Sequence, residues 1–537
     1  MTLLKNLLYL LLLLSFPLLG SAQNDKPKPH WQHLDLKEDA VFGISTDKAY
    51  QLLKNKEPIP VIVAVIDGGI DEKHEDLQDV MWQNKKEIQG NNIDDDNNGY
   101  TDDIYGWNFI GSSIGNVHYD NLEVTRLIRK YKPKYGSVLN STPLDEKERK
   151  EFETYKKLIT VYMDKLQRAQ MGQTNYTMLK KYIDQIVEKI GKNEPSLSDF
   201  EKYETKDEGE QKALKIIKSE LKDEPSFSKF YKNIKEGVDY FNAQVNYHLN
   251  LEFNSRDTVG DNYANSSERY YGNNDIAGPD AKHGTHVAGI IGAVRDNSIG
   301  IKGVADHVLI MGVRAVPDGD ERDKDVANSI RYAVDNGAKV INMSFGKAYS
   351  WDKAVVDSAV RYAMSKDVLL VHAAGNDSKN IDKEKNYPSQ YYADSSGLIT
   401  GTAAAWIEVG ASSWKNDEDL PATFSNYGKK SVDVFAPGVD INSTIPGSKY
   451  EENSGTSMAA PVVSGLAALI RSYYPQFSAV EVKDIIMKSV TKVSHRVKIR
   501  EEGATKKVHF NELCVSGGVV NAYNAIKLAA ERAEKMK

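Results

Sequence analysis

The sequence predicts an α/β protein in which a parallel β-sheet is flanked by helices. Residues 61–66 form a continuous apolar run, which is typical of a central strand buried on both faces. Similar runs occur at residues 308–313, 338–343, 368–373 and 406–409. Helical patterns lie between several of them, at residues 326–336 and 352–365. Because strands and helices alternate at this spacing, we expect a doubly wound sheet.

A long central stretch of the chain, residues 112–270, differs from the rest. It is rich in Lys, Glu and Tyr and carries no catalytic motif. Within it, residues 147–170 and 175–192 show helical periodicity with charged faces. We therefore expect a largely helical insertion at 112–270, inside a domain built from residues 59–111 and 271–537.

The N-terminus has the pattern of a signal peptide over residues 1–22. Lys5 precedes an apolar run, and Gly20, Ser21 and Ala22 supply small residues for cleavage. The run is short for a membrane span, so we expect export to the periplasm, cell surface or medium without a stable span. An uncleaved anchor is the alternative interpretation. Residues 23–58 are expected to form a leader that braces the domain.

The net charge and the cysteine content of the chain limit the classes of function that it can have. The 537-residue chain has a formal net charge of −7, and this mild acidity argues against a nucleic-acid partner. Cys514 is the only cysteine, so no intramolecular disulfide can form. An exported chain of this kind depends on a large core or on bound metal for stability.

Three short motifs place an acid, a base and a nucleophile at element ends. Asp67 follows the first apolar run, and catalytic groups gather at that edge of an open α/β sheet. His283 and Ser457 each begin a run of small residues that predicts a packed helix. A serine becomes nucleophilic only beside a base that an acid orients. His286 is the rival base, but it lies further into its helix and is expected to pack.

These motifs, in the order Asp, His, Ser, resemble those of the subtilisin-like serine peptidases, the subtilases of peptidase family S8. The resemblance covers roughly residues 59–110 and 272–475. It implies that Asp67 is the orienting acid, His283 the general base and Ser457 the nucleophile that forms an acyl-enzyme.

Two further segments resemble substrate-binding parts of subtilases. In residues 371–376, Asn376 matches the asparagine that donates its side-chain amide to the oxyanion, and Ala374 and Gly375 precede it. Ser344, Phe345 and Gly346 match the segment along which an extended peptide pairs its backbone. A turn asparagine and an ordinary strand end are the corresponding structural alternatives.

Calcium is the expected cofactor, and no organic cofactor is expected. Asp94, Asp96, Asn98 and Asp102 alternate as in an EF-hand loop, although the closing glutamate is missing. A solvated acidic loop is the alternative. By resemblance, Asp76 matches a calcium ligand of subtilases, and Asn297 lies in a loop that gives further ligands.

Together, these features predict an exported serine endopeptidase that acts on polypeptides through a Ser-His-Asp triad. Two alternatives remain open. One is a latent or occluded binding protein with a subtilase fold, and the other is an esterase or acyl-transferase that uses the same triad. Too little chain precedes residue 59 for the usual inhibitory propeptide, so we expect the insertion to help control access or folding.

Overall fold

The computed structural model describes residues 26–394, 396–501 and 503–536, so the predicted signal peptide lies outside the described residues. A nine-stranded sheet forms its centre, in the order β14-β17-β11-β10-β7-β6-β1-β5-β2. Its strands pair in parallel except β14 with β17. The strand bounds are β1 Val61–Asp67, β2 Gly106–Asn108, β5 Val308–Arg314, β6 Val340–Met343, β7 Leu369–Ala373, β10 Trp406–Ser412, β11 Val434–Pro437, β14 Thr491–Lys492 and β17 Gly518–Val519. The predicted parallel α/β fold is confirmed.

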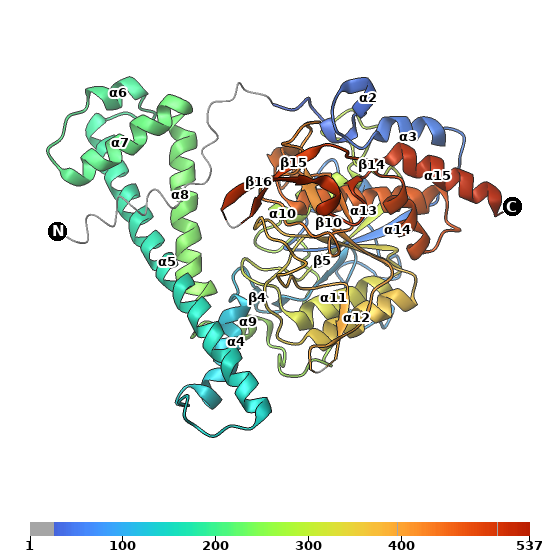
Figure 1. The fold of residues 1–537 in the computed structure, drawn as a ribbon, viewed down its shortest axis with the longest axis horizontal. Helices are drawn as coiled ribbons and strands as arrows, with labels where there is room; N and C mark the ends of the chain where they lie inside the picture. The colour runs from blue at the N-terminus through green and yellow to red at the C-terminus, as the bar shows by residue number, and fades with distance from the viewer. Residues whose placement is uncertain (1–25, 395, 502, 537) are drawn as a thin grey trace.

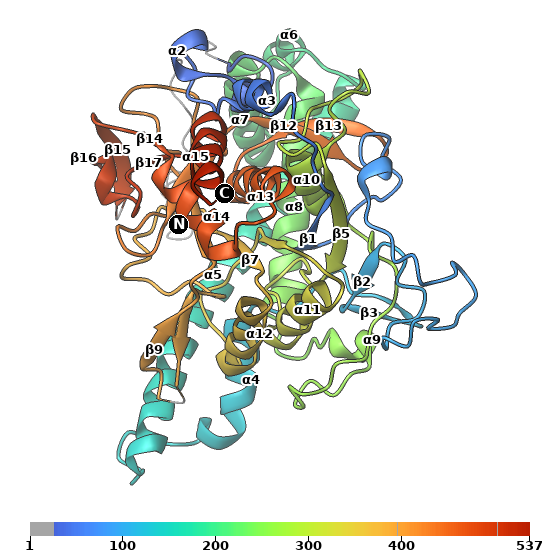
Figure 2. The same cartoon turned by 90° about the vertical axis from the view of Figure 1, so that its right-hand side faces the viewer.

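Helices cover both faces of the sheet (Figure 2). One face carries α10 (Lys282–Gly292), α13 (Thr456–Tyr473) and α14 (Ala479–Lys488), and the other carries α11 (Asp323–Asp335) and α12 (Lys353–Ser365). Strand β1 shows why its sequence is continuously apolar. Val63 and Val65 join the core of the first face, whereas Ala64 and Ile66 join that of the second. Alternate side chains of a strand point to opposite faces, so both sets must be apolar.

The described part of the leader packs onto the domain that contains the nine-stranded sheet, here called the sheet domain. Trp31 is buried, and its indole Nε1 donates to the carbonyl of Val439 at 3.1 Å. Helix α3 (Thr46–Leu53) lies against the C-terminal helix α15 (Ala522–Lys535). The amide of Ala522 also donates to the carbonyl of Ile44 at 2.7 Å. The leader therefore ties the two ends of the described chain together.

Most helices of the central stretch stand away from the sheet as an elongated lobe (Figure 1). They are α4 Glu123–Tyr135, α5 Glu146–Ile190, α6 Leu197–Lys202, α7 Glu208–Asp223, α8 Phe227–Ala243 and α9 Arg256–Val259. Two separate apolar clusters hold the lobe. A proximal cluster includes Val124, Phe152 and Leu249, and a distal one includes Ile183, Phe200 and Ile217.

Helix α5 joins the two clusters without a break. Its 45 residues span roughly 68 Å at the rise of an α-helix. The sequence predicts two helical segments here, so the continuity is a difference from expectation. Gly172 lies at the join because α8 packs closely on it, and a Cβ at this position would be 2.2 Å from a ring atom of Phe241. The glycine permits close helix packing rather than a turn.

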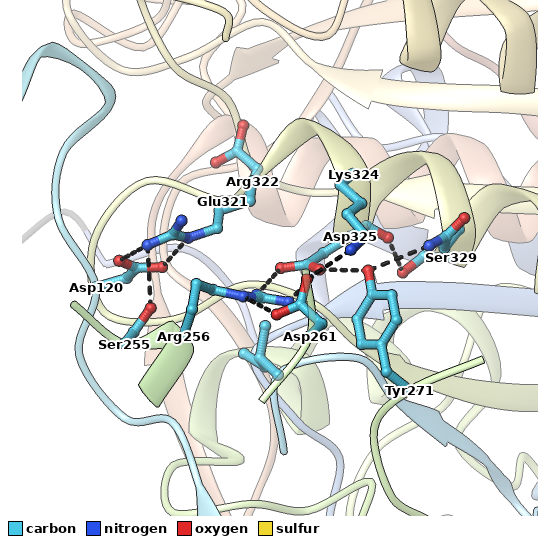
Figure 3. Close-up of polar contacts among 12 residues, drawn as sticks. Asp120, Ser255, Arg256, Asp261, Tyr271, Glu321, Arg322, Lys324, Asp325 and Ser329 are labelled. Atoms are coloured by element: carbon cyan, nitrogen blue, oxygen red, sulfur yellow. Dashed lines mark hydrogen bonds and ion pairs between the residues drawn. The ribbon is translucent and has the colours of Figure 1, made fainter. Parts of the chain in front are cut away.

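The base of the lobe is fastened to the sheet domain by buried ion pairs (Figure 3). Arg322, just before α11, binds Asp120 through Nε at 2.7 Å, and both side chains are almost fully buried. Arg256 of α9 binds Asp325 of α11 through Nη1 at 2.7 Å. The chain segment that enters the lobe and the segment that leaves it are therefore both bound, through these ion pairs, to the start of α11.

Candidate active site

Asp67 and His283 form a hydrogen-bonded pair at the carboxyl edge of the sheet. Asp67 is the last residue of β1, and its Oδ1 lies 2.7 Å from His283 Nδ1. The same Oδ1 accepts from the amide of Gly68 at 2.8 Å. His283 is the second residue of α10, which directs its ring back toward the strand end. The carboxylate therefore orients the imidazole.

The surroundings of this pair favour the protonated ring. Desolvation lowers the pKa of His283, but the Asp67 carboxylate outweighs that effect and raises the pKa above its ordinary value. Asp67 is 3% exposed, whereas the His283 side chain is 47% exposed. The acid is thus sheltered while the other face of the imidazole stays open to a reacting molecule.

Ser457 occupies the second position of α13 and makes a reciprocal contact with Ser344. Ser457 Oγ donates to the Ser344 carbonyl at 3.1 Å, and Ser344 Oγ donates to the Ser457 carbonyl at 3.0 Å. Ser344 directly follows β6, whose Met343 is in register with Ile66 of β1. Ser457 therefore lies at the same sheet edge as Asp67.

His283 and Ser457 are not joined directly. Among the described residues, no hydrogen bond links the two side chains. The Ser457 hydroxyl instead donates a hydrogen bond to the backbone carbonyl of Ser344. Helices α10 and α13, which carry them, pack against each other. Contacts between nucleophile and base are often loose until substrate binds. The Asp67–His283 pair is thus formed, and Ser457 is held beside it.

Asn376 is fixed next to Ser457 through its side-chain oxygen, and its NH₂ group makes no hydrogen bond to any described residue. Its Oδ1 accepts from the amide of Thr456 at 2.9 Å and from Thr456 Oγ1 at 3.0 Å. Its Nδ2 lies on the side of Gly455, where a Cβ would be 3.4 Å away. Because the oxygen is engaged, the NH₂ group is the part that can donate to a bound ligand.

The predicted peptide-binding segments border this group. Gly346 is exposed, and no backbone hydrogen bond reaches it from any described residue. Phe345 is nearly buried and its ring meets that of His372 edge-on, with centroids 6.3 Å apart. Ala374 is buried at the end of β7, and Gly375 follows it with a φ of 99° that favours glycine.

Comparison with known proteins decides the family. The model described as "Subtilase family" matches residues 60–508, which is most of the chain. The chain belongs to the subtilase family. Similar curated proteins include "Thermophilic serine proteinase" from Bacillus sp. (strain AK1), 41% identical over 40% of this chain and 47% of that protein. "Thermostable alkaline protease" from Halalkalibacterium halodurans is 35% identical over 43% of this chain and 56% of that protein. "Subtilisin BL" from Lederbergia lenta is 37% identical over 39% of this chain and 70% of that protein.

The matched part thus spans about half the length of the first two relatives. Within the described residues, this subtilase has no helix that is long and apolar enough to cross a membrane.

His286, the alternative candidate for the general base, is packed in the interior of this subtilase. It is fully buried, and its Nε2 lies 2.9 Å from the carbonyl of Glu451. Burial lowers its pKa to about 4, so the ring is neutral near pH 7. A histidine in this position holds the β12–β13 hairpin (Ile441–Ile445 and Lys449–Asn453) against α10.

Two buried asparagines support the site and were missed by the sequence reasoning. Asn342 donates to Ser344 Oγ at 2.9 Å and accepts from Ser464 of α13 at 2.8 Å. Asn426 donates to the carbonyl of Ala374 at 2.8 Å and also receives the amides of Asp377 and Lys379. Asn426 and the Asn342–Ser464 contact act across long sequence separations, so no local pattern marks them.

The acidic loop brings together only part of the predicted ligand set. Carboxylate oxygens of Asp94 and Asp96 meet that of Glu87 within 4.8 Å, and Glu87 is buried. Asp102 instead accepts the amides of Gly90 and Asn92. Asn98 Oδ1 accepts from the amide of Tyr100, and Asn98 Nδ2 donates to the carboxylate of Asp103. The carboxylates that come together are therefore those of Glu87, Asp94 and Asp96, and Glu87 also accepts the amides of Asp95, Asp96 and Asp102.

Asp76 and Asn297 meet each other directly. Asn297 Nδ2 donates to Asp76 Oδ1 at 2.6 Å, and the amide of Ile301 donates to Asp76 Oδ2 at 3.0 Å. Asn297 Oδ1 accepts from the amide of Ile299. In this arrangement the amide nitrogen of Asn297, rather than its oxygen, faces the carboxylate, so the pair links two loops of the subtilase.

Proposed function

We propose that this subtilase is a serine endopeptidase that cleaves polypeptides through Asp67, His283 and Ser457. The observation that carries the proposal is the 2.7 Å contact between Asp67 and His283 at the sheet edge where Ser457 lies. Family membership and relatives named as proteases support the same reaction class. The 47% exposure of the His283 side chain favours an open site over the occluded alternative.

The Asp67 contact decides which imidazole nitrogen acts as the base. Asp67 accepts the proton on Nδ1, which leaves the lone pair on Nε2. When substrate is bound, Ser457 Oγ attacks the scissile carbonyl carbon and its proton passes to Nε2. The resulting imidazolium is stabilised by Asp67 and then protonates the leaving amine. Water releases the acyl group by the same steps, with His283 again as the base.

The negative charge of the tetrahedral intermediate requires donors beside Ser457. Thr456 holds the oxygen of Asn376, which leaves Nδ2 as the donor beside Gly455, two residues before Ser457. The backbone N–H of Ser457 lies in the first turn of α13, where it has no helical acceptor. We assign these two groups to the oxyanion.

Substrate binding is assigned to the open backbone at Gly346, which is exposed and unpaired among the described residues. A peptide in extended conformation can add there as a strand, and its neighbouring residues then pass Ala374 and Gly375. Backbone pairing needs no free chain end, which favours cleavage within a chain.

Labelling with a fluorophosphonate tests the proposal. We expect the wild-type protein to be labelled at Ser457 and to cleave an unstructured protein internally, and Ser457→Ala to do neither. A folded sample that is not labelled would contradict the proposal. Incubating an ester and a peptide with an added amine separates hydrolysis from acyl transfer, because a transferase gives the amide product.

Two further properties are proposed, export from the sequence and a calcium site from the sequence and the structure together. Residues 1–22 direct export, which N-terminal sequencing of the mature protein tests through a new terminus near residue 23. Calcium binds at Glu87, Asp94 and Asp96, where hard oxygen ligands meet. Its role there is structural, because none of these side chains contacts the catalytic group.

A further inference from the structure

A cavity of about 580 Å³ lies at the base of the helical lobe, between α4, the chain leading out of the lobe and the segment before α11. Basic and aromatic side chains dominate its wall. None of Asp67, His283 and Ser457 lines it, so it is separate from the catalytic group. It is bordered by the ion pairs of Figure 3.

Some of the wall cations are neutralised. Arg322 is bound by Asp120 at 2.7 and 2.9 Å, and Arg256 by Asp325 and Asp261. These pairs are almost completely buried, so their geometry is fixed by the fold. Arg322 and Arg256 therefore form a rigid part of the cavity wall, and their charges are not free to bind a ligand.

Arg129 and Lys130 are different, because neither pairs with a carboxylate of any described residue. Arg129 Nη2 donates to the Asn121 side chain and the Phe253 carbonyl, both at 2.6 Å, while its Nε is buried without an acceptor. Desolvation and the nearby positive charge of Arg322 lower the pKa of Arg129. Lys130 holds its ammonium 4.1 Å from the ring centre of Trp351.

Another donor faces the same space, and little negative charge opposes it. The Tyr263 hydroxyl is buried without a partner, with the Arg322 guanidinium 4.5 Å from its ring centre. The acids of the wall are Asp261 and Glu252. Asp261 already forms ion pairs with Arg256 and Lys324. Only the exposed Glu252 is therefore left to balance the charges of Arg129 and Lys130. Arg129 Nε and the Tyr263 hydroxyl are buried without acceptors, which is costly, and an anionic ligand would satisfy them.

We propose that this cavity is an exosite that binds carboxylate side chains of the polypeptide substrate, and this rests on the proposed function. Trp351 of its wall lies seven residues after Ser344, so it is within about 24 Å of Ser344, which itself contacts Ser457. A bound polypeptide reaches both places. Guanidinium and ammonium groups recognise carboxylates by charge-assisted hydrogen bonds, and Trp351 and Tyr263 supply apolar contact for the side-chain stems.

Binding to the inactive Ser457→Ala protein tests the proposal without catalysis. Isothermal titration with a hexaglutamate peptide is compared with hexaglutamine and with inorganic phosphate. We expect hexaglutamate to bind, hexaglutamine not to bind, and Arg129→Met and Lys130→Met each to weaken binding at least tenfold. Lys132→Met is the matched control, because Lys132 lies on the same helix, is exposed and does not line the cavity.

The outcomes separate this proposal from the peptidase proposal. Absence of hexaglutamate binding, or equal binding in the Arg129→Met, Lys130→Met and Lys132→Met variants, overturns the exosite even if a fluorophosphonate labels Ser457. Phosphate binding as tight as that of hexaglutamate assigns the cavity to a free anion and also overturns it. For the active protein, a peptide substrate with an acidic extension is expected to show a KM at least fivefold below that of its glutamine counterpart. Lys130→Met should remove that difference without changing kcat.

Discussion

The buried ammonium of Lys347 lies 2.6 Å from the carboxylate of Glu123 and thereby connects the substrate segment to the helical lobe. Lys347 immediately follows Gly346, and Glu123 is the first residue of α4. The same ammonium lies 2.8 Å from Asp323 of α11 and donates to the Glu321 carbonyl. Burial lowers the pKa of Lys347, but the Asp323 and Glu123 carboxylates outweigh this and raise it. The lobe thus helps to set the position of the backbone at Gly346, where peptide binding is proposed.

Replacing Lys347 by Met should destabilise the protein and weaken peptide binding. Removal of the cation leaves Glu123 and Asp323 buried with one positive partner fewer, which costs about 3–5 kcal/mol. We expect a lower unfolding temperature by calorimetry and a higher KM for peptides. A small ester, which does not pair with the Gly346 backbone, should show little change in KM.

The matched control is Glu146→Gln, which breaks an exposed pair with Lys150. Such pairs contribute little, so stability and KM should stay at wild-type values. Equal changes in KM for the peptide and the ester in Lys347→Met would contradict a positioning role.

Replacing Asp67 by Asn should change both the rate and its pH dependence. The general base must be neutral, so activity is lost as pH falls through the pKa of His283. Because Asp67 raises this pKa, the acidic limb of kcat/KM in the wild type should lie above the ordinary value of about 6.5. In Asp67→Asn the limb should move to lower pH, and kcat should fall about 10⁴-fold. Stopped assays across pH measure both, and an unmoved limb would argue against this coupling.

Replacing Asn376 by Leu should lower kcat by about 10²- to 10³-fold and leave KM nearly unchanged, because the lost donor acts on the transition state. Thr456→Val is the companion variant. It keeps the amide of Asn376 but removes one of the two donors that hold its oxygen. A smaller loss of kcat is expected there. If Asn376→Leu raises KM and spares kcat, Asn376 binds the ground state instead.

The sequence was informative wherever a residue's role is set by its place at the end of an element. Asp67 ends an apolar strand, and His283 and Ser457 each begin a small-residue helix, so the structure brings Asp67 and His283 together with Ser457 alongside. The five predicted strands were recognisable because both sheet faces are covered and their sequences are continuously apolar.

Features that depend on distant partners were not predictable. Gly172 lies between the two helical segments that the sequence predicts, and only its contact with Phe241 explains a glycine inside one continuous helix. Glu87 precedes the acidic loop and has no place in the EF-hand pattern, yet it meets Asp94 and Asp96. The Lys347–Glu123 pair joins residues far apart in the chain, and no local pattern reports such a contact.

If calcium binds at Glu87, Asp94 and Asp96, it should stabilise the folded protein. Ligand bound only to the native state stabilises it by an amount that grows with ligand concentration, about 2.7 kcal/mol at one hundred times Kd. Calcium should therefore raise the unfolding temperature of the chelator-treated protein, and Glu87→Gln should abolish most of the rise. Magnesium is the control ion, because it demands a tighter octahedral geometry. An identical calcium response in Glu87→Gln would place the ion elsewhere.

The distal part of the lobe should be removable without loss of folding or of activity on short peptides. Gln173 of α5 and Asn242 of α8 are hydrogen-bonded at 3.0 Å, so a linker of about four residues can join them in place of residues 174–241. This removes the distal apolar cluster but keeps the proximal cluster and every ion pair at the base. Deleting residues 115–265 instead removes Asp120, Arg256 and Glu123, and leaves Arg322 buried without its carboxylate. We expect the first variant to be soluble and to cleave a short peptide at the wild-type rate, and the second to unfold or aggregate. A soluble, fully active 115–265 deletion would show that the base of the lobe does not support the sheet domain.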